Sequence, residues 1–349
     1  MTPHSVRRPD GYCLNEISKA IFKNITIIPI MVVPSEPPLS ICRIQWLDMQ
    51  DCFPLDIRHK SYQQKFEKLL SGLKTRSFEY DGEQNTLLSI LKPIDFSIDI
   101  LRHLNPTRDF GRKWLIDKID DWFNDSQQLN RIFWITGAPG IGKSAIASWL
   151  CENRKEISAI HFCIDKDEEK IKLVNFIKSI IYQICTQLPD YKHILTQTLD
   201  FREILNEYFD YPKTLFSKLI TQPLNKISKP EHPITILIDA LDEASKDGRN
   251  EFAELIATEF EKTPAWLRLI ITSRPDHEVM IPLQKFSPFK LDASCDENIN
   301  DIKSFLQVEL LPFLDEVELC RKDEFVEKIA KNSEGVFLYV IFISLSINI

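Results

Sequence analysis

Glycine is scarce in this sequence, and its cysteines are not arranged in pairs. Among 349 residues there are only nine glycines, and none of the eight cysteines belongs to a C-x-x-C pair. The absence of such pairs excludes zinc knuckles and dithiol redox motifs of the usual spacing. The formal net charge is -8. The chain therefore has no global positive field for a phosphate backbone, and we expect no nucleic-acid partner.

The sequence also lacks the patterns that direct a chain to a membrane. Residues 1–13 contain no apolar stretch of the kind found in signal peptides. The apolar run at 335–349 has about fifteen residues, which is fewer than the roughly 20 that span a bilayer as a helix. We interpret this run as a buried helix, and we expect a cytoplasmic protein with no membrane partner.

The composition is that of a soluble globular protein. Hydrophobic residues make up 44% of the chain and charged residues 27%. A chain of this length favours more than one domain. The patterning predicts a small α/β piece at 1–74, a connector at 75–105, a larger α/β region at 106–290 and a helical region at 291–349.

The first piece combines one strand with two helices. The β-branched run at 25–33 predicts a buried strand, and the segment at 14–22 suits a helix. A second helix is expected at 61–74, where five apolar side chains fall on one helical face. These side chains are Tyr62, Phe66, Leu69, Leu70 and Leu73.

From residue 106 onward, helical and strand patterns alternate along the chain. The expected helices include 112–124 and 144–154, and the expected strands are 131–136, 159–163, 234–239 and 267–273. The last two strands are continuous apolar runs, which is typical of parallel strands covered on both faces. We therefore predict an α/β fold in which helices flank a parallel sheet.

Three of the nine glycines lie within six residues, in a loop between a predicted strand and a predicted helix. The stretch reads GAPGIGKS and fits G-x-x-x-x-G-K-[ST], the phosphate-binding P-loop. Glycines let successive N–H groups turn toward an anion, and the following helix adds the positive end of its dipole. Lys143 is expected to reach the β- and γ-phosphates, and the Ser144 hydroxyl to bind Mg²⁺. The predicted nucleotide-binding residues are Gly137, Ala138, Pro139, Gly140, Ile141, Gly142, Lys143, Ser144 and Ala145.

Carboxylates for a metal and for a water molecule follow the next apolar strand. Asp239 ends that strand and is predicted to hold Mg²⁺ together with Ser144. Asp242 or Glu243 would orient or deprotonate the attacking water. Arg274 follows the last predicted strand, at the same edge of the sheet, where an arginine can sense the γ-phosphate or stabilise its charge. We predict that Asp242, Glu243 and Arg274 carry the chemistry.

Several segments besides the P-loop resemble one known family. They are the acidic segment LIDALDE at 237–243, the strand IITSRP at 270–275, FGRKWLIDKIDDWF at 110–123 and SEGVFLYV at 333–340. Through these segments, residues 106–349 resemble the NACHT family of STAND signal-transduction ATPases, the nucleotide switch of NOD-like receptors.

The NACHT resemblance implies cofactors, a mechanism and partners. It implies an ADP-bound resting state and an ATP-bound active state that self-associates, with Mg²⁺ as the metal. It places Phe110, Gly111 and Arg112 near the adenine. It also identifies 291–349 as the start of a helical lid that is truncated here.

The first 74 residues resemble the second half of a TIR domain. SVRRPDGYCLNEISKAI at 5–21 is similar to its third helix, ITIIPIMVV at 25–33 to its fourth strand, and YQQKFEKLL at 62–70 to its last helix. In TIR domains that cleave NAD, a glutamate on that third helix is catalytic, and Glu16 occupies the matching place. The alternative is an ordinary solvated glutamate. The resemblance also implies TIR-type signalling partners.

The leading hypothesis is a signalling switch that binds ATP and hydrolyses it slowly. One alternative is an NAD-cleaving or adaptor TIR protein in which the P-loop domain is only an oligomerisation scaffold. Another is a phosphotransferase or motor ATPase, which would need an acceptor pocket or a basic tract. His161 and Cys163 are expected to be packed in a strand rather than to bind a metal. Trp114 and Trp122 are expected in the core or at an interface.

Overall fold

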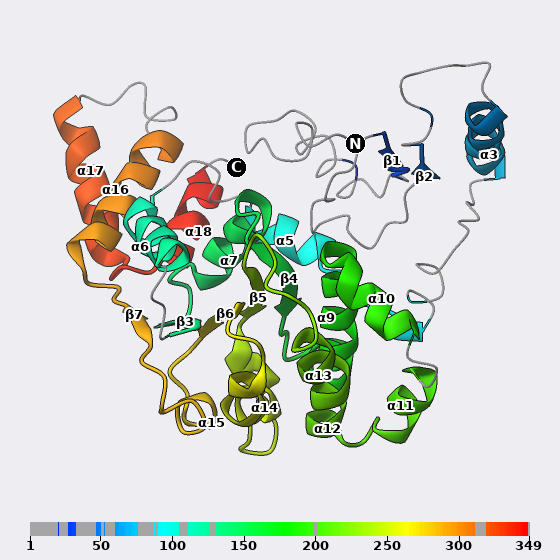
Figure 1. Cartoon of the computed structure of the whole chain (residues 1–349). Coiled ribbons are helices and arrows are strands. Elements are labelled where there is room, and N and C mark those ends of the chain that lie inside the picture. Colours follow the sequence, from blue (N-terminus) through cyan, green and yellow to red (C-terminus); the bar gives the residue numbers. More distant parts are fainter. Residues whose placement is uncertain are drawn as a thin grey trace.

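The centre of the molecule is a five-stranded parallel sheet with the strand order β4-β5-β6-β3-β7 (Figure 1). A computed structural model describes residues 20, 27–32, 47–49, 52, 60–75, 87, 90–104, 111–125, 130–197, 201–310 and 319–347. The strands of the sheet are β3 (Ile132–Gly137), β4 (Ile157–Phe162), β5 (Ile234–Asp239), β6 (Leu267–Ser273) and β7 (Phe289–Leu291). The predicted α/β fold, with helices flanking a parallel sheet, is confirmed.

The strand order determines which loops meet at the sheet edge. Strand β6 pairs with both β3 and β5, so one strand separates the P-loop strand from the strand that ends at Asp239. Every residue of β5 is buried, as expected for an apolar strand covered on both faces. Because all five strands are parallel, the segments that follow β3, β5 and β6 emerge at the same carboxyl edge.

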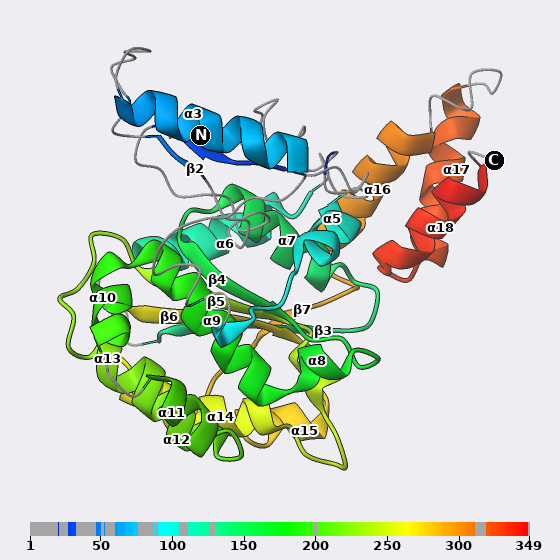
Figure 2. The ribbon, with the colours of Figure 1, turned by 90° about the vertical axis from the view of Figure 1, so that its right-hand side faces the viewer.

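Helices cover both faces of the sheet (Figure 2). One face is covered by α5 (Ser97–Leu104), α6 (Lys113–Asn124) and α7 (Lys143–Asn153). The other is covered by α9 (Leu173–Gln187), α10 (Pro189–Gln197), α11 (Phe201–Glu207), α12 (Pro212–Phe216) and α14 (Glu251–Glu259). The shorter elements are α8 (Glu168–Ile171), η4 (Ser217–Thr221), α13 (Gln222–Leu224), η5 (Leu241–Ala244), η6 (Phe260–Lys262) and α15 (His277–Met280). Adjacent residues of each strand face opposite cores, as in Leu237 and Ile238.

The predicted connector ends in a helix that packs on the sheet domain. Ile100 of α5 is fully buried in the same core as Leu150 of α7. Asp99, also on α5, forms a largely buried ion pair of 2.8 Å with Lys170 of α8. This helix therefore adds to the apolar core that supports α7 behind the P-loop.

A π-helical turn joins α12 to α13. Pro223 has no N–H, so in a regular helix the carbonyl of Leu219 would lose its partner four residues on. The buried hydroxyl of Tyr191 donates to that carbonyl instead, at 2.6 Å. A tertiary hydrogen bond thus replaces the missing helical one.

Three helices follow the sheet: α16 (Asp296–Leu310), α17 (Leu319–Asn332) and α18 (Phe337–Ile347). They share a small apolar core of their own, in which Phe305, Leu306, Val326 and Phe337 are buried. In Figure 1 they are the orange and red ribbons. We refer to residues 296–347 as the helical unit.

The N-terminal part contains two short parallel strands, β1 (Ile30–Met31) and β2 (Leu47–Asp48), and the helix α3 (Lys60–Thr75). The predicted helix at 61–74 is confirmed, but its apolar face is only partly covered. Tyr62 and Leu69 pack on the small cluster around Leu47, whereas Phe66, Leu70 and Leu73 are exposed. Glu16, Phe110 and nearly all of the helix predicted at 14–22 lie outside the described residues.

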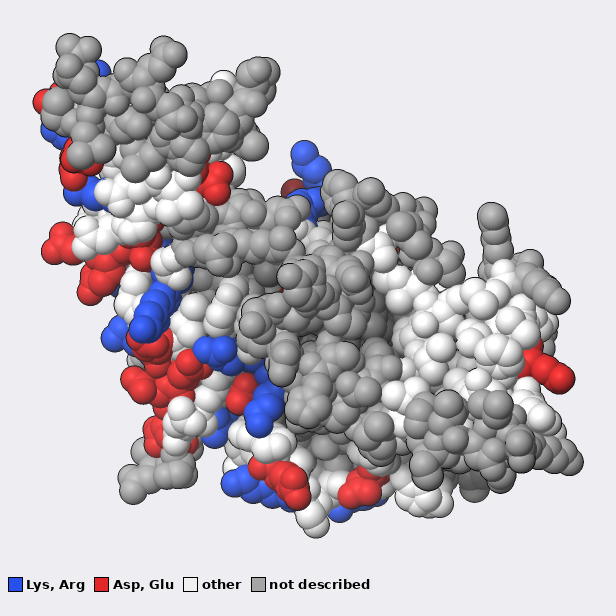
Figure 3. All heavy atoms as spheres, turned by 90° about the horizontal axis from the view of Figure 1, so that it is seen from above, with Lys and Arg blue, Asp and Glu red and all other residues white. Residues whose placement is uncertain are grey.

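Within the described ranges, no helix has the length and apolar character needed to cross a bilayer. Figure 3 gives the view from above, and on the described part of this face acidic and basic side chains are interspersed.

Candidate functional site

The P-loop connects β3 to α7 and has the backbone that its glycines allow. Gly140 and Gly142 have φ values of 73° and 101°, a region that side chains with Cβ rarely adopt. Gly142 is the N-cap residue of α7, and among the described residues no side chain caps this helix. The first N–H groups of α7 are therefore available to an anion, which the helix dipole also favours.

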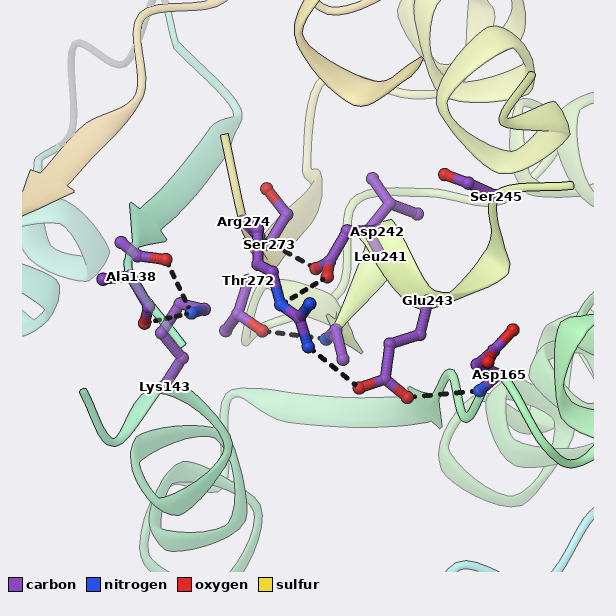
Figure 4. A network of polar contacts seen from close by, with 12 residues as sticks. Ala138, Lys143, Asp165, Leu241, Asp242, Glu243, Ser245, Thr272, Ser273 and Arg274 are labelled. Carbon is purple, nitrogen blue, oxygen red and sulfur yellow. Dashed lines mark hydrogen bonds and ion pairs between the residues drawn. The ribbon is translucent and has the colours of Figure 1, made fainter. Parts of the chain in front are cut away.

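The side chain of Lys143 folds back onto the loop that precedes it. Its Nζ donates to the carbonyl oxygens of Gly137 and Ala138 at 2.8 and 3.0 Å (Figure 4). Burial lowers the pKa of Lys143, while the nearby charges of Asp242 and Asp239 raise it. The ammonium thus lies against the P-loop and close to the acidic residues, and its contact with the β- and γ-phosphates stays a prediction.

Asp239 lies at the end of β5 within a network of hydroxyl groups. The Thr272 hydroxyl donates to Asp239 Oδ1 at 2.5 Å and accepts from the backbone N–H of Ala240 at 2.9 Å. Burial raises the pKa of the Asp239 carboxyl, and hydrogen bonds from Thr272 and Ser144 oppose that shift. The predicted metal pair, Ser144 and Asp239, thus lies at the same edge of the sheet, where the Ser144 hydroxyl helps to lower the pKa of the Asp239 carboxyl. Their hydroxyl and carboxylate oxygens are ligands that Mg²⁺ prefers, so the residues present fit this ion.

Asp242 and Arg274 form a pair beside this network. Asp242 Oδ1 accepts from the backbone N–H of Arg274 at 2.8 Å, and Oδ2 lies 3.3 Å from Arg274 Nε. The Asp242 side chain is only 4% exposed, against 44% for Arg274. Both carboxylate oxygens of Asp242 are therefore engaged by the arginine that the sequence assigns to the γ-phosphate.

Glu243 is held more loosely, at the rim of the same cluster. Its Oε2 accepts from the backbone N–H of Asp165 at 3.2 Å, and Oε1 lies 4.0 Å from Arg274 Nη2 (Figure 4). Burial raises the pKa of the Glu243 carboxyl, and the charges of Asp242 and Asp239 add to the shift. A partly exposed carboxylate of raised basicity suits a residue that accepts a proton from water. Of the two candidates, Glu243 fits that role better.

Of the two described residues predicted to lie near the adenine, Gly111 approaches Asp301 of α16 and Arg112 contacts the P-loop. The guanidinium Nη2 of Arg112 donates to the carbonyl of Ile141 at 2.5 Å, and its Cζ lies 4.7 Å from the centroid of the Phe337 ring. Burial lowers the pKa of Arg112 to about 10. The adenine contact itself stays a prediction.

Two participants in this site were not predicted from the sequence. Thr272 was assigned no role, although a hydroxyl at the end of an apolar strand is a signal for one. Phe337 was expected only as part of a later helix, and no local pattern indicates that its ring covers Arg112.

His161 is packed inside the strand region, as expected. Its ring lies among Phe96, Phe176 and Phe252, with centroid distances of 5.2, 5.2 and 5.5 Å. Nε2 lies 2.8 Å from the carbonyl of Lys170. Because a carbonyl only accepts, Nε2 carries the proton. Among the described residues the buried Nδ1 has no hydrogen-bond partner.

The packing of His161 predicts a pH-dependent stability. Burial lowers the pKa of His161 to about 4 from its ordinary 6.5. Between these values the unfolded chain binds a proton that the folded chain does not, so stability falls as the pH is lowered. Between pH 7 and pH 4 this group should cost about 3 kcal/mol of unfolding free energy. We expect urea unfolding to show that, between pH 7 and pH 4, the unfolding free energy of His161→Gln falls by about 3 kcal/mol less than that of the wild type. The exposed His277→Gln serves as the control, and a wild-type pH dependence in His161→Gln would contradict the prediction.

One family model matches the chain, over residues 112–274, which is somewhat less than half of its length. No NACHT or TIR family model matches. The matched segment begins at Arg112 and ends at Arg274, so it contains the P-loop, Asp239 and the acidic residues that follow. The sheet domain with its candidate nucleotide site is thus similar to the family described as Nephrocystin 3, N-terminal.

Proposed function

We propose that this protein is an ATP-binding switch that hydrolyses its nucleotide slowly and whose nucleotide state controls its conformation and self-association. The observation that carries the proposal is the arrangement at the carboxyl edge of the sheet. There the P-loop, the Lys143 ammonium and Ser144 lie close to the buried carboxylate of Asp239. Four separate requirements of a magnesium nucleotide site, namely N–H donors, a cation, metal ligands and a carboxylate base, are met in one place.

Each residue has a distinct task in this proposal. The N–H groups of the P-loop and Lys143 bind the phosphates, and Ser144 and Asp239 hold Mg²⁺, Asp239 through water. When bound, Mg²⁺ neutralises charge on the phosphate oxygens. Glu243 orients the attacking water and accepts its proton, and Arg274 senses the γ-phosphate.

The contacts of Lys143 and Arg274 support a nucleotide-dependent switch. To reach a γ-phosphate, Arg274 must loosen its ion pair with Asp242, and Lys143 must leave the carbonyls of Gly137 and Ala138. ATP and ADP differ in the γ-phosphate that draws these side chains away. A nucleotide can shift a conformational equilibrium only through such a difference in contacts between states.

The assignment to a class of switch rests on sequence resemblance. Residues 106–349 resemble NACHT-type STAND ATPases, and we propose that the chain works in signal transduction as those proteins do. The first 74 residues would be a partial TIR-type module that contacts other signalling proteins.

Calorimetric titration with ADP and ATP in the presence of Mg²⁺ tests the proposal. Wild-type protein should bind both nucleotides, and Lys143→Ala should bind them about 30- to 150-fold more weakly, since a charged hydrogen-bond donor to phosphate contributes about 2–3 kcal/mol. Lys155→Ala is the matched control because Lys155 is exposed just beyond the other end of α7. A folded wild-type protein that binds neither nucleotide would end the proposal, as would unchanged affinity in Lys143→Ala.

A further inference from the structure

The turn before α18 lies directly on the P-loop. The backbone N–H of Leu338 donates to the carbonyl of Gly140 at 3.0 Å. Leu338 is in the first turn of α18, where backbone N–H groups have no partner within the helix. The P-loop carbonyl therefore caps this helix. A Cβ at Gly140 would lie 2.9 Å from Val336 Cγ1 and 3.0 Å from Leu338 Cβ, so the approach requires glycine at this position of the loop.

Arg112 makes a second connection between the P-loop and the helical unit. Its guanidinium donates to the carbonyl of Ile141 and stacks over Phe337 at the start of α18. Its backbone N–H donates to Asp301 Oδ2 of α16 at 2.9 Å, and the indole Nε1 of Trp114 donates to the same oxygen. Arg112 is 7% exposed. This arginine is thus fixed by two helices of the helical unit and by the P-loop together.

The two carbonyls held in this way are consecutive, and this determines the direction of two N–H groups. The carbonyl of Gly140 and the N–H of Ile141 belong to one planar trans peptide, in which they point in opposite directions. The same holds for the carbonyl of Ile141 and the N–H of Gly142. Because the carbonyl of Gly140 faces Leu338 of the helical unit and that of Ile141 faces Arg112, these two N–H groups point away from Leu338 and Arg112.

We propose that Leu338 and Arg112 form a latch through which the helical unit holds the P-loop in its phosphate-accepting shape, with Arg112 as a positioning residue. The proposal rests on the function proposed above and names its regulation. Phosphate bound at the N–H of Ile141 or Gly142 polarises the same peptide and strengthens the hydrogen bond at its carbonyl. Nucleotide binding and docking of the helical unit therefore favour each other, and this coupling is reciprocal.

Arg112 also has hydrogen-bonding capacity that the described residues do not use. Its Nη1 is buried and has no partner among them. Leaving a buried donor unpaired is unfavourable. The bond of Arg112 to Ile141 and its stacking on Phe337 must therefore offset this cost for the arginine to stay in place.

The test combines nucleotide affinity with hydrogen exchange of the backbone amides at 336–342, measured by mass spectrometry. In the wild type, ADP with Mg²⁺ should slow exchange of these amides by about 10-fold. Arg112→Lys keeps the charge but not the planar, stacked guanidinium, so it should weaken ADP binding by about 10-fold and abolish the ligand-induced slowing. Leu338→Pro removes the N–H, together with the leucine side chain, in the first turn of α18, where helices tolerate proline, and it should act in the same direction.

Two variants serve as matched controls. Arg268→Lys changes an arginine that likewise donates to a backbone carbonyl, that of Phe123, and stacks on an aromatic ring, that of Trp122. Arg268 is near the start of β6, away from the carboxyl edge, so this variant should bind ADP as the wild type does. Leu338→Ala keeps the N–H and should retain the ligand-induced slowing.

The outcomes separate the latch from the proposed function. If the wild type binds ADP, and Arg112→Lys and Leu338→Pro match it in both affinity and exchange, the latch is wrong and the nucleotide switch stands. If the wild type binds no nucleotide, the proposed function fails. The latch is then tested by hydrogen exchange of the amides at 336–342 in the absence of nucleotide. Faster exchange at 336–342 in Arg112→Lys than in Arg268→Lys would support the contact, and equal exchange would overturn it.

Discussion

Glu243→Gln is expected to lower the turnover of ATP hydrolysis by about 100- to 10,000-fold, the range in which a positioned general base contributes. Asp242 engages Arg274 with both of its carboxylate oxygens, whereas Glu243 is partly exposed and has a raised pKa. Glutamine keeps the size and the hydrogen bond to Asp165 but cannot take a proton. ATP affinity should stay within about threefold of the wild type, because the phosphates are bound by the P-loop and Lys143. Single-turnover hydrolysis and calorimetric titration on the same preparations measure the two quantities.

Glu251→Gln is the control for this variant, because Glu251 is exposed at the start of α14 and should tolerate the change. Asp242→Asn distinguishes the two carboxylates. If Asp242→Asn abolished turnover while Glu243→Gln kept wild-type turnover, the roles would be the reverse of those assigned here. If neither changed turnover, hydrolysis would not depend on this acidic segment.

Gly335→Ala is expected to lower the unfolding free energy of the helical unit by about 4 kcal/mol or more, because a methyl group cannot fit there. Gly335 has a φ of 79°, and a Cβ at this position would lie 1.9 Å from the carbonyl oxygen of Ala293 and 2.5 Å from its carbon. That backbone cannot easily move, since the buried Asn298 donates to the carbonyls of both Ala293 and Gly335, at 2.7 and 2.9 Å. Urea unfolding combined with hydrogen exchange of 333–347 measures the loss.

Gly248→Ala is a closely matched control for Gly335→Ala. Gly248 has a φ of 73°, and a Cβ there would meet nothing within 4 Å. Gly248→Ala should therefore lower the unfolding free energy by only about 1–2 kcal/mol, the strain of an alanine in the left-handed region. If the two variants lost the same stability, the tight fit of Gly335 against Ala293 would not contribute, and the attachment of α18 would have to depend on other contacts.

Most strands were predictable because their residues carry a local signal. The runs predicted at 234–239 and 267–273 coincide with β5 and β6. A strand buried on both faces needs only continuous apolar, β-branched residues, and these can be recognised in a short window. Strand β7 was not predicted. It has three residues and lies at the sheet edge, so it is defined by its pairing with β3 rather than by its composition.

The candidate site, too, was predictable from the sequence only in part. The P-loop is a contiguous motif whose backbone is largely set by its own glycines, so its residues could be named from the sequence. The ion pair between Asp242 and Arg274 could not be predicted from the sequence, because it depends on β5 and β6 being neighbours in the sheet. The same limit applied to α3, where periodicity placed Phe66, Leu70 and Leu73 on the buried face but the structure leaves them exposed.

The α/β alternation, the P-loop and the acidic residues at the end of β5 could be predicted without a structure, because each of these depends on residues close together in the chain. The strand order, the engagement of Asp242 by Arg274 and the contact of Arg112 and Leu338 with the P-loop became known from the packed fold alone. Those features join segments separated by 29 to 198 positions, as in the contacts of Arg112 with Ile141 and of Gly140 with Leu338. Such contacts depend on how the packed elements lie against one another, and no local pattern of residues encodes that arrangement.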